Sequence, residues 1–298
     1  MVTHVRRLRM LIGRYCCLAA VICGVDCTPT ADSDDLGAVE SIDPNNPPVN
    51  TGQWYHPALT DRWQWQLQPN AAGAINTSYE VEVYDVDLFN VSDAVISDLH
   101  ARGKRVVCYF SAGSYETFRN DAGEFQASDL GNTLGDYPDE RWLDIRSENV
   151  HRIMLARLDL AASRTCDAVE PDNVDGYVNH SGFPLTAADQ LAFNRLIANQ
   201  AHTRGLGVGL KNDLDQVPQL VNYFDFSINE QCHEFNECDA LQPFLDAEKP
   251  VFNAEYASSF VNSGSNRDQL CSDARDQNIR TLVLPIDLND SFRFSCDP

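Results

Sequence analysis

Eight short apolar runs alternate with longer stretches of helical spacing between residues 63 and 284, and this order constrains the fold more than any other feature of the sequence. The runs are rich in β-branched and aromatic side chains, as buried parallel strands are. The predicted strands are 63–67, 81–84, 106–110, 168–170, 207–210, 226–228, 251–254 and 281–284. Such alternation predicts a parallel sheet covered by helices.

Helices are predicted in the segments between these strands. Ser92 precedes apolar residues at helical spacing and is a candidate N-cap, while Thr186 and Asp189 form a capping-box pattern. Gly103 and Gly205 each stand where a helix must stop before the next strand. The predicted helices are 92–102, 147–163, 187–204, 214–221, 239–247 and 267–277.

Eight strands in this order fit an α/β fold, a (β/α)8 TIM barrel that forms a single domain over residues 54–298. The alternative is a doubly wound open sheet. No GxGxxG or P-loop motif follows any of the predicted strands, which disfavours the nucleotide-binding version of that alternative.

The N-terminal residues precede this domain. Residues 1–27 combine four arginines with a short apolar stretch, which predicts a signal peptide or a lipoprotein leader. In the second case Cys23 or Cys27 would carry the lipid. Residues 28–53 are acidic and rich in Pro and Asn, as flexible tethers are. No other segment approaches the roughly 18 apolar residues of a membrane span, so we expect a secreted protein or one anchored by a lipid at the cell surface.

The formal net charge is −22. Such a surface repels phosphate backbones and anionic membranes, so nucleic acid is excluded as an expected partner, whereas a polycation is attracted. A simpler interpretation is that the charge keeps an exported protein, which we expect to be a monomer, dispersed.

Six cysteines lie outside the leader, and an even number in an exported chain suggests disulfides. Cys232 and Cys238 are close enough for a local bridge, and Cys271 with Cys296 would hold the C-terminus, but the sequence leaves the pairing open. Zinc binding by Cys232, His233 and Cys238 matches no known ligand spacing, so we expect no metal.

Carboxylates, amides and aromatic rings follow nearly every predicted strand. In a barrel these positions meet at the C-terminal rim, where active sites lie. Glycoside hydrolysis needs two carboxyl groups flanking the scissile bond, with further polar groups and aromatic rings to bind the sugars. The candidates for substrate binding are Trp65, Asp85, Asp87, Tyr109, Ser111, Glu170, Asn173, Lys211, Asn212, Glu255, Tyr256 and Asp287.

Two other interpretations apply to these residues. Acids at strand ends often only cap the next helix or pair with Lys and Arg. Lys211 could form a Schiff base, although its acidic neighbours favour a charged hydrogen-bond donor. Ser111 lacks the GxSxG context of a nucleophilic serine.

Several longer motifs occur in order along residues 54–296, and with them the sequence resembles glycoside hydrolase family 114, the endo-α-1,4-polygalactosaminidases and related barrel proteins. The motifs are VVCYFSAGSYE (106–116), WLDIR (142–146), CDAVEPDNVDGY (166–177), GFPLTAADQLAFN (182–194), GLGVGLKND (205–213), DFSINEQCHEFNEC (225–238) and VFNAEY (251–256). Ala168 departs from the family pattern, in which glycine is typical.

The resemblance implies cleavage of α-1,4-linked galactosamine polymers without a metal or other cofactor. It places the catalytic aspartate of EPDN at Asp172 and the catalytic glutamate of NEQC at Glu230. It further implies a retaining reaction with Asp172 as nucleophile and Glu230 as general acid/base. Asp85, Asp87, Glu170, Glu255 and Asp287 become candidates for pairing with the ammonium groups of this cationic polysaccharide.

Two other functions remain open at this stage. The chain could be a non-catalytic carbohydrate-binding barrel at the cell surface, although intact Asp172 and Glu230 favour an enzyme. It could also be an α-glycosidase that acts on another polysaccharide, because family resemblance fixes the reaction type better than the sugar.

Overall fold

The computed structural model of the protein describes Asp43 and residues 45–297. The described residues all belong to one compact unit. The predicted leader and the predicted tether up to residue 42 lie outside the described residues.

Eight parallel strands form one sheet in which each strand pairs with its neighbour in chain order. These strands are β1 (Trp63–Gln66), β2 (Val83–Asp87), β3 (Arg105–Ser111), β7 (Ala168–Asp172), β8 (Gly207–Lys211), β9 (Phe226–Glu230), β10 (Val251–Glu255) and β11 (Arg280–Val283). The short strand β12 (Phe294–Ser295) pairs with β11 in the antiparallel direction.

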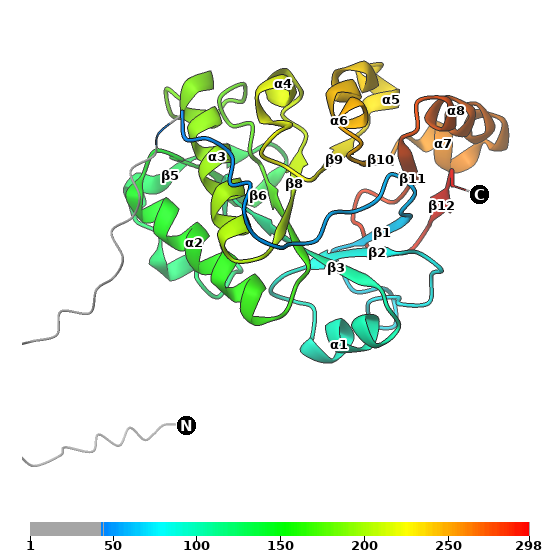
Figure 1. Cartoon of the computed structure of the whole chain (residues 1–298), viewed down its shortest axis with the longest axis horizontal. Helices are drawn as coiled ribbons and strands as arrows, with labels where there is room; N and C mark the ends of the chain where they lie inside the picture. Colours follow the sequence, from blue (N-terminus) through cyan, green and yellow to red (C-terminus); the bar gives the residue numbers. More distant parts are fainter. Residues whose placement is uncertain (1–42, 44, 298) are drawn as a thin grey trace, which may run out of the picture. The chain divides into compact units, whose positions relative to one another are not determined.

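The sheet curls until its two ends meet (Figure 1). The indole Nε1 of Trp63 in β1 donates to the carbonyl of Arg280 in β11 at 2.9 Å. Just beyond these strands, the amide of Leu67 donates to the carbonyl of Leu288 at 3.1 Å. The expected (β/α)8 barrel is therefore confirmed.

Two hydrophobic clusters lie on the two faces of this sheet. Alternate strand residues such as Trp63, Trp65, Phe226 and Ile228 pack together in one cluster, which fills the inside of the barrel. The intervening strand residues, such as Phe110, pack with the helices in the larger cluster. The barrel interior is thus a packed core, and a ligand can bind only at its rim.

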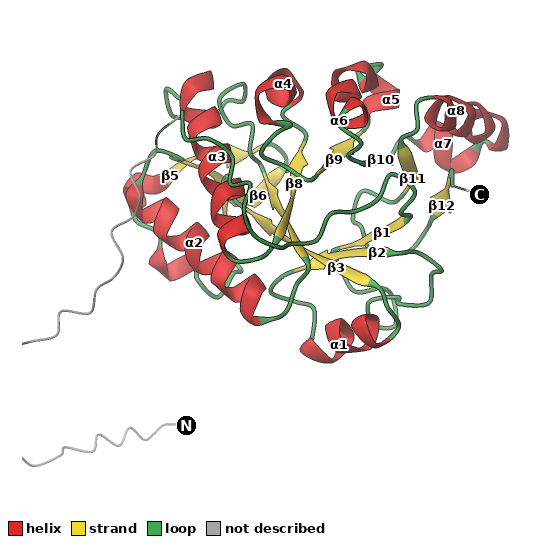
Figure 2. Cartoon of the chain, in the orientation of Figure 1, coloured by secondary structure: helices red, strands yellow, loops and turns green. Residues whose placement is uncertain are grey.

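Helices cover the outside of the sheet (Figure 2). The Ser92 side chain caps the first helix, and Thr186 and Asp189 form the predicted capping box. Two predicted helices, 214–221 and 239–247, are each a 3₁₀ turn followed by a short α-helix with Pro in its first turn. The α-helices are α1 (Asp93–Ala101), α2 (Glu148–Ser163), α3 (Ala187–Thr203), α4 (Val217–Leu220), α5 (Cys232–Phe235), α6 (Gln242–Asp246), α7 (Ser258–Asn262) and α8 (Gly264–Asp276).

A three-stranded antiparallel sheet interrupts the alternation between β3 and α2. It consists of β4 (Ser114–Glu116), β5 (Leu130–Leu134) and β6 (Tyr137–Leu143). The amide of Leu143 donates to the carbonyl of Gly113 at 2.9 Å, which ties this insertion to the C-terminal end of β3. The insertion therefore stands at the rim of the barrel.

Three disulfides link the six cysteines of this unit. Cys108 in β3 pairs with Cys166 just before β7, Cys232 pairs with Cys238 around α5, and Cys271 in α8 pairs with Cys296 near the C-terminus. The two pairings that sequence spacing suggested are both present. Covalent links at these positions restrain the unfolded chain and so stabilise the domain.

The segment before Trp54 already packs on the barrel. The amide of Val49 donates to Asn199 Oδ1 in α3 at 2.8 Å, and the Trp54 ring stacks on the His202 imidazole with centroids 4.1 Å apart.

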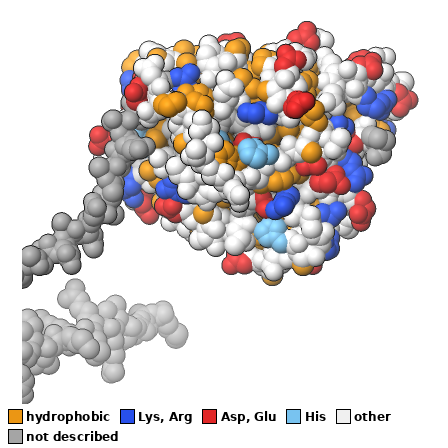
Figure 3. Space-filling model, in the orientation of Figure 1, with side chains coloured by type: hydrophobic (Ala, Val, Ile, Leu, Met, Phe, Trp, Pro, Cys, Tyr) orange, Lys and Arg blue, Asp and Glu red, His pale blue; other side chains and the backbone are white. Residues whose placement is uncertain are grey.

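On the face in Figure 3, acidic and basic side chains are intermixed, so the excess of acids forms no continuous patch there. None of the helices in the described residues is long and apolar enough to cross a membrane.

Candidate active site

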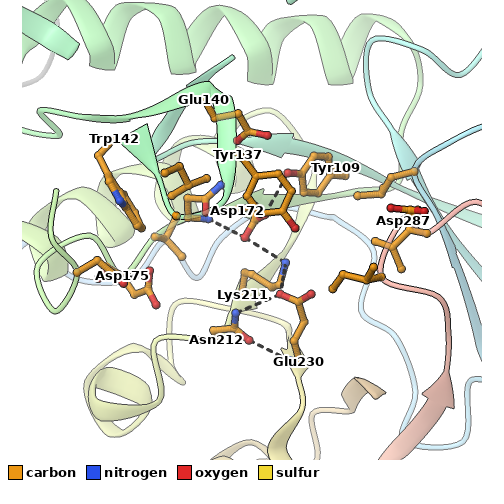
Figure 4. Close-up of a pocket in the computed structure, with 18 of the residues that line it drawn as sticks. Tyr109, Tyr137, Glu140, Trp142, Asp172, Asp175, Lys211, Asn212, Glu230 and Asp287 are labelled. Carbon is orange, nitrogen blue, oxygen red and sulfur yellow. Dashed lines mark hydrogen bonds and ion pairs between the residues drawn. The ribbon is translucent and has the colours of Figure 1, made fainter. Parts of the chain in front are cut away.

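A cleft of about 1040 Å³ opens at the C-terminal ends of the strands. Its walls come from β1, β3, β7, β8 and β9, from the insertion, and from the loop after β11 (Figure 4). Eight predicted residues line it: Trp65, Tyr109, Asp172, Asn173, Lys211, Asn212, Glu230 and Asp287.

The Lys211 ammonium joins the two predicted catalytic carboxylates. Its Nζ lies 3.0 Å from Asp172 Oδ1 and 3.3 Å from Glu230 Oε2, and it is 3.2 Å from Glu170 Oε1. Asp172 Oδ1 and Glu230 Oε2 therefore lie no more than 6.3 Å apart. Burial lowers the pKa of Lys211, but Asp172, Glu230 and Glu170 outweigh it and hold that pKa well above its usual value. Lys211 is therefore a cation and is unsuited to Schiff-base formation.

Each of the two predicted catalytic carboxylates also accepts a hydrogen bond from a tyrosine. The Tyr109 hydroxyl donates to Asp172 Oδ2 at 3.0 Å, and the Tyr256 hydroxyl donates to Glu230 Oε1 at 2.6 Å. Burial and the neighbouring carboxylates raise the pKa of both phenols well above the usual value. Both tyrosines therefore remain protonated donors.

The backbone after β7 places Asp172 and Asn173. Asn173 has a φ of 59°, and its amide donates to Asp172 Oδ1 at 2.7 Å while its Nδ2 donates to Ser111 Oγ at 2.8 Å. A Cβ at Gly113 would lie 1.8 Å from the Asn173 carbonyl oxygen. Only glycine at position 113 therefore allows this close approach.

The amide of Asn212 orients Glu230. Asn212 Oδ1 accepts a hydrogen bond from the Glu230 backbone amide at 3.0 Å, and its Nδ2 lies 3.4 Å from Glu230 Oε2. Like Asn173, Asn212 directly follows a strand and has a positive φ, here 47°. Asn173 contacts Asp172 through its backbone N–H, whereas Asn212 contacts Glu230 through its side chain.

A buried pair of acids lies beneath Lys211. Neither Asp85 nor Glu170 reaches the cleft surface, since their exposed fractions are 1% and 0%. Burial and the charge of Glu170 raise the pKa of Asp85 well above its usual value, and burial raises that of Glu170 to about 7. These acids lie on the side of Lys211 that faces away from the cleft, too deep to contact a sugar.

Three further predicted residues have structural partners away from the cleft. Asp87 forms an ion pair with Arg119 at 2.7 Å. The Ser111 hydroxyl is within 2.6 Å of the Ser114 hydroxyl, and Glu255 Oε1 accepts from the amide of His233 at 2.9 Å. All three predicted residues are buried, so they hold the strand ends and loops in place.

Several cleft residues are absent from the predicted set, and four of them carry aromatic or acidic side chains close to the catalytic candidates. Tyr137, Glu140 and Trp142 come from β6 of the insertion, and Asp175 comes from the loop after β7. Burial and Glu116 raise the pKa of Glu140 to about 7, and burial and Asp172 raise that of Asp175 to about 6. Asp175 and Trp142 belong to quoted motifs and could have been included, whereas no pattern in the sequence indicates that Tyr137 and Glu140 reach the rim.

The only group of possible metal ligands found in the described residues lies away from this cleft. Donor atoms of Cys232, His233 and Cys238 lie within 4.8 Å of one another. Because the two cysteines form a disulfide, neither offers a thiolate. This group therefore does not form a zinc site.

We expect the free energy of unfolding to fall as the pH rises from 4.5, the pKa of a free glutamic acid, to about 7, the raised pKa of Glu140 and Glu170. Over this range the folded protein retains protons that the unfolded chain releases, so the stabilisation present below the lower pKa is lost through the higher one. Thermal unfolding at about pH 5 and about pH 7.5 measures the effect, and Glu140→Gln should reduce it. A melting temperature that instead increases over this interval would contradict the expectation.

The comparisons with known proteins agree with this architecture. A family model described as glycoside-hydrolase family GH114 matches residues 44–298. The structure of Aspergillus fumigatus Ega3 in complex with galactosamine is 41% identical, with a TM-score of 0.77, and the match covers 83% of this chain and 99% of that one. The glycoside hydrolase domain of PelA from Pseudomonas aeruginosa is 13% identical, with a TM-score of 0.59 and coverage of 78% and 97%, which shows a shared fold. No curated protein matches the chain.

Proposed function

The chain belongs to glycoside-hydrolase family GH114 and is a glycoside hydrolase, and we propose that it cleaves α-1,4-linked galactosamine polymers with Asp172 and Glu230 as the catalytic pair. The observation that carries this proposal is the position of Lys211, which contacts both carboxylates at the centre of the cleft. The same contact supports a retaining reaction, because retaining enzymes hold their carboxyl groups about 5–5.5 Å apart and inverting enzymes about 6.5–9.5 Å.

The division of roles between the two carboxylates follows the family resemblance. Asp172, whose oxygens bind Lys211 and Tyr109, attacks the anomeric carbon and forms a glycosyl ester. Glu230 gives its proton to the oxygen of the departing sugar. It then takes a proton from the water that breaks the ester, and this second displacement restores the original anomeric configuration.

The charge of the cleft supports an amino sugar as substrate. Glu140, Asp175 and Asp287 line the cleft, and none of them forms an ion pair with a Lys or Arg of the described residues. Asp175 and Asp287 lie on opposite sides of the catalytic pair in Figure 4. Carboxylates on both sides suit a polymer that carries one ammonium on each unit, and Ega3, the relative at 41% identity, was solved with galactosamine.

Incubation with purified galactosamine oligomers, with and without N-acetyl groups, followed by mass analysis of the products, tests this proposal. We expect cleavage of the unacetylated oligomers and much slower cleavage of the fully acetylated ones. Cleavage of neither set, together with activity on another α-linked polysaccharide, would reject galactosamine as the substrate and retain the hydrolase.

We expect added salt to slow hydrolysis of the cationic polymer but to leave a short N-acetylated oligomer unaffected. The net charge of −22 concentrates polycations near the protein, and the Debye length shrinks from about 30 Å at 0.01 M salt to about 3 Å at 1 M. The measurement is kcat/KM for both substrates across that range. Equal salt responses would show that the acidic surface serves solubility alone.

The disulfides support export of the protein. Three of them cross-link the described domain, and disulfides persist in oxidising compartments such as the extracellular space. We therefore propose a secreted enzyme, with lipid anchoring through Cys23 or Cys27 as a variant of the same localisation.

A further inference from the structure

A second hollow of about 340 Å³ adjoins the cleft between the loops that follow β7, β8 and β9. We call it the side hollow and define it by Tyr177, Asp213, Asp215, Asn229, Phe235 and Glu237. Asp175, Asn212 and Glu230 line both spaces. The cleft and the side hollow therefore adjoin at these three residues.

The wall of the side hollow contains two buried acceptors without donors. Asp213 is 4% exposed and Asn229 is 1% exposed, and the Oδ1 atom of each accepts no hydrogen bond. Their other polar atoms are engaged, because Asn194 Nδ2 donates to Asp213 Oδ2 at 2.9 Å and Asn229 Nδ2 donates to Asn212 Oδ1 at 3.2 Å. Buried polar atoms are nearly always paired in native proteins, so the Asn229 oxygen and the Asp213 carboxyl are available to a ligand.

The side hollow is also short of cations. Asp175, Asp213, Asp215 and Glu237 line it, and within the described residues none of them forms an ion pair with Lys or Arg. Burial raises the pKa of Asp175 to about 6 and that of Asp213 to about 8, so at neutral pH Asp175 is largely ionised while Asp213 retains its proton. A ligand that suits this environment carries positive charge and several donors.

Apolar side chains complete the lining. Phe235 is 59% exposed and Val178 is 60% exposed, and both border the side hollow. The other large hydrophobic side chains exposed in the described residues, Phe118, Tyr137 and Ile286, line the main cleft. Exposed apolar groups concentrated at one place mark a binding surface, and an aromatic ring can stack on the apolar face of a sugar.

The position of Glu230 indicates which part of a substrate reaches the side hollow. Glu230 lines both spaces, whereas Asp172 lines only the main cleft. In the proposed function Glu230 protonates the departing oxygen, so the side next to Glu230 and away from Asp172 receives the leaving group. We infer that the side hollow is a binding site for an amino-sugar unit on the leaving-group side of the scissile bond. This inference rests on the proposed function.

Asp215→Asn and Phe235→Ala test the inference, because both side chains are exposed and their replacement disturbs no core packing. The substrates are a galactosamine hexamer, which fills both sides of the site, and α-galactosaminyl fluoride, whose leaving group is too small to enter the side hollow. We expect the ratio of kcat/KM for the hexamer to kcat/KM for the fluoride to fall about tenfold in each variant. Asp276→Asn is the matched control, since it removes an exposed acid on α8 that lines neither space, and its ratio should equal that of the wild type.

An unchanged ratio in both variants, with a wild type that cleaves the hexamer, would overturn the side hollow as a binding site and leave the proposed function intact. An equal loss in Asp276→Asn would attribute the effect to overall charge and would overturn it as well. A wild type that leaves the hexamer uncut would overturn the proposed function, and the inference with it.

Discussion

We expect the substitution Asp172→Asn to lower the rate of galactosamine-oligomer hydrolysis by several orders of magnitude. The substitution keeps the size and shape of the side chain but removes the anion that attacks the anomeric carbon, so no glycosyl ester forms. A loss of three orders of magnitude corresponds to about 4 kcal/mol of barrier height. The measurement is kcat for the oligomer with wild type and variant, and circular dichroism verifies the fold.

Azide distinguishes the chemical role of Asp172 from a structural one. In Asp172→Asn, azide can replace the missing nucleophile and attack the substrate directly, which gives a glycosyl azide of the opposite anomeric form. Lys211 remains buried between Glu170 and Glu230 in this variant, so the charge of the pocket is only partly altered. An Asp172→Asn enzyme with nearly full activity would remove Asp172 from the mechanism.

The apolar runs predicted the barrel because each central strand is buried on both faces and so consists of nearly continuous hydrophobic residues. The predicted C-terminal ends of several strands fall too early, because these strands end on a charged residue. Asp87, Asp172 and Glu255 are the final residues of β2, β7 and β10, although their charge reads as the start of a loop. Arg119 pairs with Asp87 and Lys211 with Asp172, and neither cation lies in the strand that it compensates.

The insertion shows where periodicity is uninformative. β6 has the sequence YPDERWL, is largely exposed and contains a proline, so neither alternation nor an apolar run marks it as a strand. Its pairing with β4 and β5 nevertheless brings Tyr137, Glu140 and Trp142 to the cleft. Tertiary contacts of this kind cannot be inferred from local sequence.

The ionic partners of the predicted site residues, rather than their burial, decide what each residue does. Lys211 looked like one polar side chain among several at the strand ends, yet it bridges the two carboxylates at the centre. Asp87 is predicted to bind the sugar, yet it forms an ion pair with Arg119, which lies between β4 and β5 of the insertion. The residue types were predictable from the sequence, but their partners depend on segments far apart along the chain.

Glu230→Gln should have a different signature from Asp172→Asn. An amide cannot protonate the departing oxygen, so hydrolysis should fall most for oligomers, whose sugar leaving groups need that proton, and least for an activated aryl glycoside, which leaves as a stable anion. General acid–base catalysis contributes typically about 10²–10⁴-fold, and the expected loss on oligomers lies in that range. The measurement is kcat/KM on both substrates for variant and wild type.

Azide again separates the roles, because the glycosyl ester still forms from the aryl glycoside when Asp172 is intact. In Glu230→Gln the ester then accumulates, since no base activates water, and azide attacks it without needing a base. Two successive displacements at one carbon preserve its configuration, so the product is a glycosyl azide of the same anomeric form as the substrate.

Asn212→Asp is a useful companion variant, because it replaces the amide that lies 3.4 Å from Glu230 Oε2 with an acid while Glu230 itself is retained. Azide product of the opposite anomeric form from Glu230→Gln would reverse the assignment, since it would make Glu230 the nucleophile and leave Asp172 as the acid/base.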